Sequence, residues 1–225
     1  MKYLRVFFQA FCQPIIFSRI STKPISNDFG LSRGTPIDRF YIDSFLKENE
    51  FDIKGTALEI AESTYTKRFD HGVTSFEVLH VDESNGKATI IGDLTQPDSL
   101  PEKMVDCFIC TQTLNFIFDV RKAVDGCFKL LRDGGVFLGT VSGISQISRY
   151  DMDRWGDYWR FTDLSLKKLF SEYFREENIT IQTYGNVFAA NAFLQGLALE
   201  DIEDKSLLNV NDPDYQVTLG IRAVR

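Results

Sequence analysis

Residues 105–141 read VDCFICTQTLNFIFDVRKAVDGCFKLLRDGGVFLGTV. The segment 105–110 is almost wholly apolar, as in a strand that is buried on both faces of a sheet. Apolar residues then recur at positions 120, 124, 128 and 131, which is helical spacing, and Gly134 and Gly135 follow as a helix stop signal. Residues 136–141 are apolar again. The stretch therefore predicts a strand, a helix and a second strand, the unit from which parallel sheets are built.

Similar elements occur on both sides of this stretch. We expect strands at 56–60, 75–81, 88–92, 179–184 and 215–221, and helices at 36–47, 164–174 and 191–199. Strands that alternate with helices predict the α/β class. The last two strands alternate polar and apolar residues, which is typical of antiparallel pairing. The predicted fold is a Rossmann-like, doubly wound, mainly parallel sheet with an antiparallel C-terminal edge hairpin.

Composition and length indicate a single globular domain. The chain has 225 residues, of which 44% are hydrophobic and 25% charged. We expect a domain at 33–225 that follows an N-terminal extension, residues 1–32. Residues 1–27 contain four basic residues and no acidic one, which suits a targeting segment, a membrane-surface contact or a packed extension. No stretch is long and apolar enough to predict an integral membrane segment, and the expected location is the cytoplasm.

Charge and cysteine spacing argue against two other classes of protein. The formal net charge of −7 is unlike that of a general nucleic-acid binder. Cys107 and Cys110 form a CxxC pair inside an apolar run, but no second pair or nearby histidine completes a zinc site. We therefore expect buried, reduced strand cysteines and no metal.

Polar side chains follow the first four predicted strands. In a doubly wound sheet, ligands bind beyond the carboxyl ends of the strands. Glu59 ends the first strand, Asp82 follows the second and Asp93 the third, and Thr111 and Gln112 follow the fourth. A carboxylate after the second strand suits the two hydroxyls of a ribose, and one after the third can accept a hydrogen bond from an adenine amine.

With these motifs the sequence resembles the class I S-adenosylmethionine-dependent methyltransferases, in particular those with a type 11 domain. The resemblance covers roughly 33–225 and rests on LEI (58–60), GDL (92–94), DCFICTQTL (106–114) and LLRDGGVFLGTV (130–141). Two further stretches, SRGTPIDRFYI (32–42) and SGISQISRYDMDRWGDYWRFT (142–162), look like a bacterial subgroup associated with polysaccharide and glycosyltransferase functions.

The resemblance implies S-adenosyl-L-methionine as the cofactor and assigns a role to each polar strand end. Glu59 and the loop of Ala61, Glu62 and Ser63 would face the methionine part of the cofactor. The residues implied for the rest of the cofactor are Asp82 at the ribose, Asp93 and Leu94 beside the adenine, and Thr111 and Gln112 near the transferred methyl group.

The loop after the first strand departs from the family pattern Glu-x-Gly-x-Gly-x-Gly. Its glycine positions hold Ala61, Ser63 and Tyr65. Glycine allows positive φ and a close approach to the ligand, so Ala61 narrows that approach, and Glu62 adds negative charge near the cofactor's carboxylate. Asn115 stands where many members carry histidine.

Two arginines before the first strand, Arg33 and Arg39, are candidates to contact the cofactor's carboxylate. Helix capping and surface pairing are the alternative roles for these side chains.

The most unusual segment is RYDMDRWGDYWRF (149–161), which directly follows the strand at 136–141. Aromatic faces stack on sugar rings and carboxylates accept hydrogen bonds from sugar hydroxyls. Asp151 or Asp153 could therefore take the proton from an attacking hydroxyl. The alternative is a structural lid, held by tryptophan anchors and Arg–Asp pairs.

Two functional hypotheses follow. The first is an S-adenosylmethionine-dependent O-methyltransferase that acts on a sugar or glycan hydroxyl, so that its partner is a small-molecule or glycan acceptor. The second is a catalytically inactive methyltransferase-like scaffold with a protein partner. A nicotinamide-dependent oxidoreductase is disfavoured because no GxGxxG follows the first strand.

Overall fold

The computed structural model describes residues 21–225, so most of the predicted extension at 1–32 and most of the segment at 1–27 lie outside the described residues. The strands are β1 (Gly55–Ile60), β2 (Val73–His80), β3 (Ile90–Ile91), β4 (Val105–Thr111), β5 (Leu131–Ser142), β6 (Ile179–Tyr184) and β7 (Thr218–Val224). The helices are α2 (Ile37–Glu48), α3 (Thr64–Arg68), α4 (Val120–Leu130), α5 (Arg149–Met152), α6 (Asp163–Phe170) and α7 (Val187–Leu194). Short 3-10 turns join several of them.

The strands form one seven-stranded sheet in the order β3-β2-β1-β4-β5-β7-β6. The pairs from β3 to β5 are parallel, whereas β7 runs antiparallel to both β5 and β6. The predicted doubly wound sheet with an antiparallel C-terminal hairpin is confirmed. The strand order reverses between β1 and β4, which is where such sheets bind ligands.

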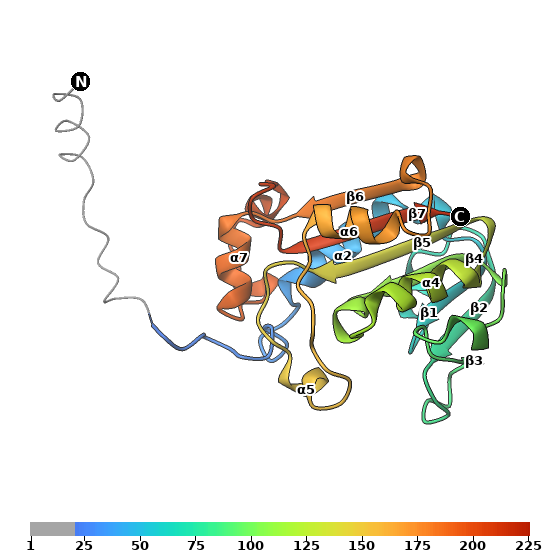
Figure 1. Ribbon diagram of the computed structural model, residues 1–225. Helices are drawn as coiled ribbons and strands as arrows, with labels where there is room; N and C mark the ends of the chain where they lie inside the picture. Colours follow the sequence, from blue (N-terminus) through green and yellow to red (C-terminus); the bar gives the residue numbers. More distant parts are fainter. Residues whose placement is uncertain (1–20) are drawn as a thin grey trace, which may run out of the picture.

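Side-chain alternation along the central strands explains why helices cover both faces of the sheet. Phe108 and Phe137 face one side, where they pack with residues of α4 and α6. Cys107, Ile109 and Leu138 face the other side and pack against α2. Figure 1 shows α4 and α6 in front of the sheet and α2 behind it. Cys107, Cys110 and Cys127 are free and buried, as predicted for the first two.

Some element boundaries differ from the predicted ones. The predicted helix at 191–199 is α7, Val187–Leu194, because the Asn186 side chain accepts from Ala189 N and starts the helix earlier. The predicted strand at 136–141 begins at Leu131, directly after α4, and Gly134 with φ +81° lies within it.

The first described residues pack against the segment around 195–201. Ile25 N donates to Gln195 O, and Thr35 N donates to the Glu200 carboxylate at 2.7 Å. Arg33 makes a bidentate pair with Asp201 at 2.6 and 2.7 Å. Within residues 21–225, no helix has the length and apolar character needed to cross a membrane.

Candidate functional site

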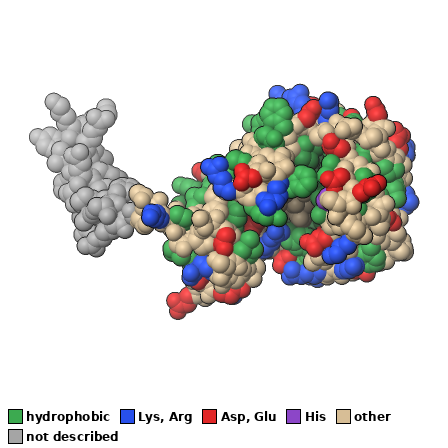
Figure 2. Space-filling view, turned by 90° about the horizontal axis from the view of Figure 1, so that it is seen from below, with side chains coloured by type: hydrophobic (Ala, Val, Ile, Leu, Met, Phe, Trp, Pro, Cys, Tyr) green, Lys and Arg blue, Asp and Glu red, His purple; other side chains and the backbone are tan. Residues whose placement is uncertain are grey.

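Two adjoining cavities, of about 840 and 510 Å³, lie beyond the carboxyl ends of the parallel strands. Ile60, Ala61, Gln112, Thr113, Phe116 and Asp151 line both of them. We call the cavity of 840 Å³ the larger cavity and the other the smaller cavity. Figure 2 shows a hollow on this face, with hydrophobic, acidic and basic side chains around it. The shared residues mark the junction of the two cavities.

Glu59, at the end of β1, holds the following loop in place. Its buried carboxylate accepts from Tyr65 N at 3.2 Å, from Thr66 N at 2.9 Å and from Thr66 Oγ1 at 2.9 Å. Burial raises the pKa of Glu59, and the hydrogen bonds from Thr66 and Tyr65 oppose that rise. Glu59 lines the larger cavity, but the hydrogen bonds that its carboxylate accepts all come from Tyr65 and Thr66 of the loop.

Ala61 has a φ of +63°, in the left-handed region that favours glycine. It lines both cavities, and Glu62 beside it lines the larger one. Ser63 is the residue before α3 and is not among the lining residues. At the first glycine position of the family pattern, Ala61 therefore adopts a backbone conformation that strains an L-residue and that glycine adopts at less cost.

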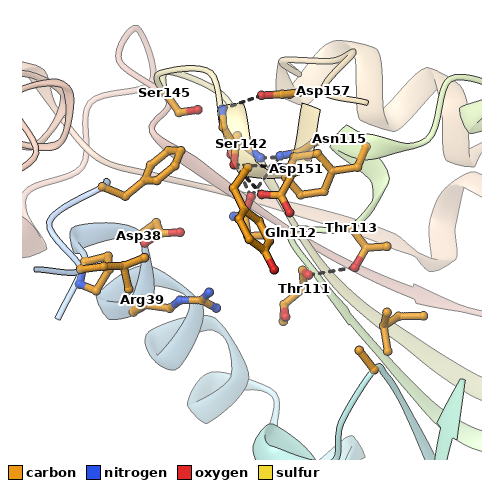
Figure 3. A pocket seen from close by; sticks show the side chains of 18 of the residues that line it. Asp38, Arg39, Thr111, Gln112, Thr113, Asn115, Ser142, Ser145, Asp151 and Asp157 are labelled. Carbon is orange, nitrogen blue, oxygen red and sulfur yellow. Dashed lines mark hydrogen bonds between the residues drawn. The ribbon is translucent and has the colours of Figure 1, made fainter. Parts of the chain in front are cut away.

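Asp38 and Arg39 extend from α2 into the larger cavity (Figure 3). Arg39 Nη1 donates to Tyr65 Oη at 2.9 Å. Among the described residues, Asp38 Oδ1 is buried and has no hydrogen-bond partner. Burial raises the pKa of Asp38, and the charge of Arg39 opposes the rise. Sequence reasoning considered Arg39 but missed Asp38, whose only signal was an acid in the first turn of a helix.

The residues after β4 form a hydrogen-bonded network at the junction. Gln112 has a φ of +47°, and its Oε1 accepts from Ser142 Oγ at 2.8 Å and from Asn115 Nδ2 at 3.2 Å. Two donors on one oxygen fix the orientation of the Gln112 amide. Thr111 lines the larger cavity beside it. Asn115, at the position where many family members carry histidine, is buried and serves this network.

The structure separates the two acids that follow β2 and β3. Asp93 and Leu94 line the smaller cavity. Asp93 Oδ1 accepts from Thr95 N and Thr95 Oγ1, both at 2.8 Å. Asp82 lines neither cavity: its Oδ1 accepts from Ser84 N at 2.9 Å and lies 3.2 Å from His80 Nδ1.

The segment after β5 overhangs both cavities. It carries Asp151 and Asp153, the two candidate proton acceptors, in different positions. Asp151 lines both cavities, and Ser148 Oγ donates to its Oδ2 at 2.5 Å. Asp153 is exposed and lines neither. Asp157 accepts from Ser148 N at 2.9 Å and pairs with Arg160 at 2.6 Å. The predicted Arg–Asp anchoring is therefore present, and Asp151 lies within reach of the junction.

Metal ligands do not gather at this site. Across residues 21–225, no three His, Cys, Asp or Glu side chains are placed to hold a metal ion.

Comparisons with known proteins agree on the fold. Residues 50–139 match the family model described as "Methyltransferase domain". No curated protein matches the chain in sequence. A SAM-dependent methyltransferase from Archaeoglobus fulgidus superposes with a TM-score of 0.53 at 13% identity, over 83% of this chain and 94% of its own. One from Mesorhizobium loti gives 0.53 at 15% identity, over 87% and 100%.

A third solved structure contains a bound cofactor product. The N-methyltransferase NodS from Bradyrhizobium japonicum WM9, in complex with S-adenosyl-L-homocysteine, superposes with a TM-score of 0.51 at 16% identity, over 90% of this chain and 94% of its own. The family-model match and the superposed structures agree that the chain has the fold of the class I methyltransferases.

Proposed function

We propose that the chain transfers a methyl group from S-adenosylmethionine to a hydroxyl of a sugar or glycan. When bound, the cofactor supplies an electrophilic methyl group on a sulfonium. Its methionine part would occupy the larger cavity and its adenine the smaller one, so the methyl group would lie at the junction beside Gln112 and Asp151. This orientation follows from the family-implied places of Ala61 and Asp93.

The larger cavity offers complementary charges for an amino acid. Arg39 would pair with the carboxylate of the cofactor, and Asp38 would accept from its ammonium group. The buried, unpartnered oxygen of Asp38 supports this assignment, because a carboxylate in that state gains most from a cationic ligand. Asp93 would accept from the adenine amine. Asp82 would bind the ribose after turning away from Ser84 and His80.

The side of the larger cavity opposite α2 indicates the chemical class of the methyl acceptor. The observation that carries it is a group of neutral hydrogen-bonding side chains in the larger cavity, Ser142, Ser145, Gln146 and Ser148, which lie beside the Arg160–Asp157 ion pair and Arg149. Hydroxyl and amide groups pair with sugar hydroxyls without demanding a charge. Asp151 lies next to this side of the cavity, and its Oδ2 is held by Ser148. Its other oxygen would accept the proton that the acceptor hydroxyl loses as its oxygen bonds to the methyl carbon.

The test is release of S-adenosylhomocysteine with a panel of monosaccharides, methyl glycosides and short oligosaccharides, set against primary amines of similar size. We expect turnover with a member of the sugar panel. Asp151→Asn should lower kcat about 10²- to 10⁴-fold, the range for loss of a general base, whereas Asp153→Asn should match the wild type.

Three results would contradict the proposal in different ways. Turnover with amines alone would refute the acceptor class. Equal activity of the two aspartate variants would refute the role of Asp151. If S-adenosylhomocysteine does not bind at all, the inactive scaffold with a protein partner becomes the better account.

A further inference from the structure

The smaller cavity combines an aliphatic lining with four Phe, Trp or Tyr side chains. The aliphatic residues are Ile60, Ala61, Leu79, Val81, Leu94 and Ile117. The aromatic ones are Phe116 and Phe118, which follow β4, and Trp155 and Tyr158, which belong to the segment after β5. Phe118, Trp155 and Tyr158 are 69%, 50% and 49% exposed, so much of their ring surface is open.

The aromatic side chains are held where they are by contacts between two loops. Tyr158 N and Trp159 N donate to Asn115 O at 3.0 and 3.2 Å, and Trp159 Nε1 donates to Ile117 O at 3.0 Å. Phe118 and Tyr158 meet edge to face at a centroid distance of 5.3 Å, and Trp155 meets His80 in the same way at 6.3 Å. The segment after β5 is thus attached to the loop after β4, next to the smaller cavity.

We infer that Trp155 and Tyr158 cover the adenine of the cofactor. Taken alone, the aromatic content of their segment suggests instead that these rings stack on a sugar acceptor. A purine is flat and has π faces that stack on indole and phenol rings. The amine on the edge of adenine can donate a hydrogen bond to the Asp93 carboxylate. Asp93 lines the same cavity. This inference rests on the proposed function, because it requires the adenine to occupy the smaller cavity.

Tryptophan fluorescence can report this contact without an added label. The two tryptophans of the chain are Trp155 and Trp159, so Trp159→Phe leaves Trp155 as the sole indole and Trp155→Phe leaves Trp159. Each full-length variant is titrated with S-adenosylhomocysteine and with 5′-methylthioadenosine, which has the adenine but no amino acid. Fluorescence reports the indole, and calorimetry reports binding independently.

We expect both ligands to change the emission of Trp159→Phe as they do in the wild type, and to leave that of Trp155→Phe largely unchanged. Trp155→Ala should weaken S-adenosylhomocysteine binding roughly 5- to 100-fold, the range for losing one base–aromatic stack. Phe51→Ala, an exposed aromatic residue that lines neither cavity, is the matched control and should bind as the wild type does.

Two results overturn the inference and can be told apart. If calorimetry shows binding to the wild type but the emission of Trp155 does not respond, the aromatic contact is absent while the proposed cofactor site stands. If the wild type gives no binding heat with S-adenosylhomocysteine, the proposed function fails, and the adenine contact fails with it.

Discussion

Ala61 carries a backbone conformation that glycine adopts more easily. Its φ of +63° costs an L-residue about 1–2 kcal/mol, and glycine would give back about 0.5–1 kcal/mol through its flexibility in the unfolded chain. We therefore expect Ala61→Gly to raise the free energy of unfolding by about 0.5–1 kcal/mol in denaturant titration. It should also tighten S-adenosylhomocysteine binding, since a methyl group that faces both cavities is removed.

A second alanine-to-glycine exchange, within the strand that precedes Ala61, is the matched control. Ala57 is buried in β1 and is not among the residues with positive φ. Ala57→Gly should destabilise the protein. If Ala61→Gly destabilises it as much as Ala57→Gly does, the strain at Ala61 is not real.

At Asp38, in contrast to Ala61, we expect cofactor binding and folding stability to oppose each other. Burial raises the pKa of Asp38 in the folded protein, so the native state binds more protons than the unfolded state between the ordinary value of 3.8 and the raised one. Stability is therefore lost as pH rises through that window. Asp38→Asn should be more stable than the wild type at pH 7, yet bind S-adenosylhomocysteine more weakly.

Asp43→Asn is the control for this pair of effects. Asp43 accepts from Arg68 at 2.7 and 3.0 Å and lines neither cavity, so its variant should leave cofactor affinity unchanged. Unchanged affinity in Asp38→Asn as well would remove Asp38 from the proposed cofactor site.

The segment after β5 depends on Asp157 for its attachment. Burial opposes ionisation of Asp157, but hydrogen bonds from Arg160 and Ser148 outweigh it and lower the pKa. The stabilisation is present above the ordinary pKa and is lost as pH falls through the lowered one. Asp157→Asn should speed hydrogen exchange of residues 148–160 at least tenfold at pH 7, because a hydrogen bond to a charged group contributes about 1.5–3 kcal/mol.

Asp153→Asn, in the same segment but exposed, should exchange at the wild-type rate. Equal exchange in the two variants would show that Asp157 does not hold the segment.

At the level of elements, sequence patterns predicted the strands and helices that have strong periodicity. The apolar run of β4 and the helical spacing of α4 are local signals, and both elements lie where expected. The start of α7 depends on the Asn186 side chain, and β7 starts three residues later than its apolar pattern indicated. Such boundaries are set by individual capping and turn contacts, which periodicity does not contain.

Across the whole molecule, the predicted doubly wound sheet accounts for why Ala61, Gln112 and Asp93 lie at one edge, because the topology of such a sheet fixes where strand ends meet. Side-chain directions were not predictable in this way. Asp82 turns toward Ser84 and His80, and Asp38 reaches the cavity from a helix that precedes the sheet. The direction of Asp82 is set by local side-chain contacts two residues away, and Asp38 comes from a helix outside the strand-end pattern, so the pattern predicts neither.

The central claim is that the two cavities form a working cofactor site although Ala61 replaces a loop glycine. The most direct test is calorimetric titration of the wild type and of Asp93→Asn with S-adenosylhomocysteine. We predict micromolar binding by the wild type and binding at least tenfold weaker in the variant, which corresponds to about 1.4 kcal/mol. Absence of heat from the wild type at millimolar ligand would contradict the account.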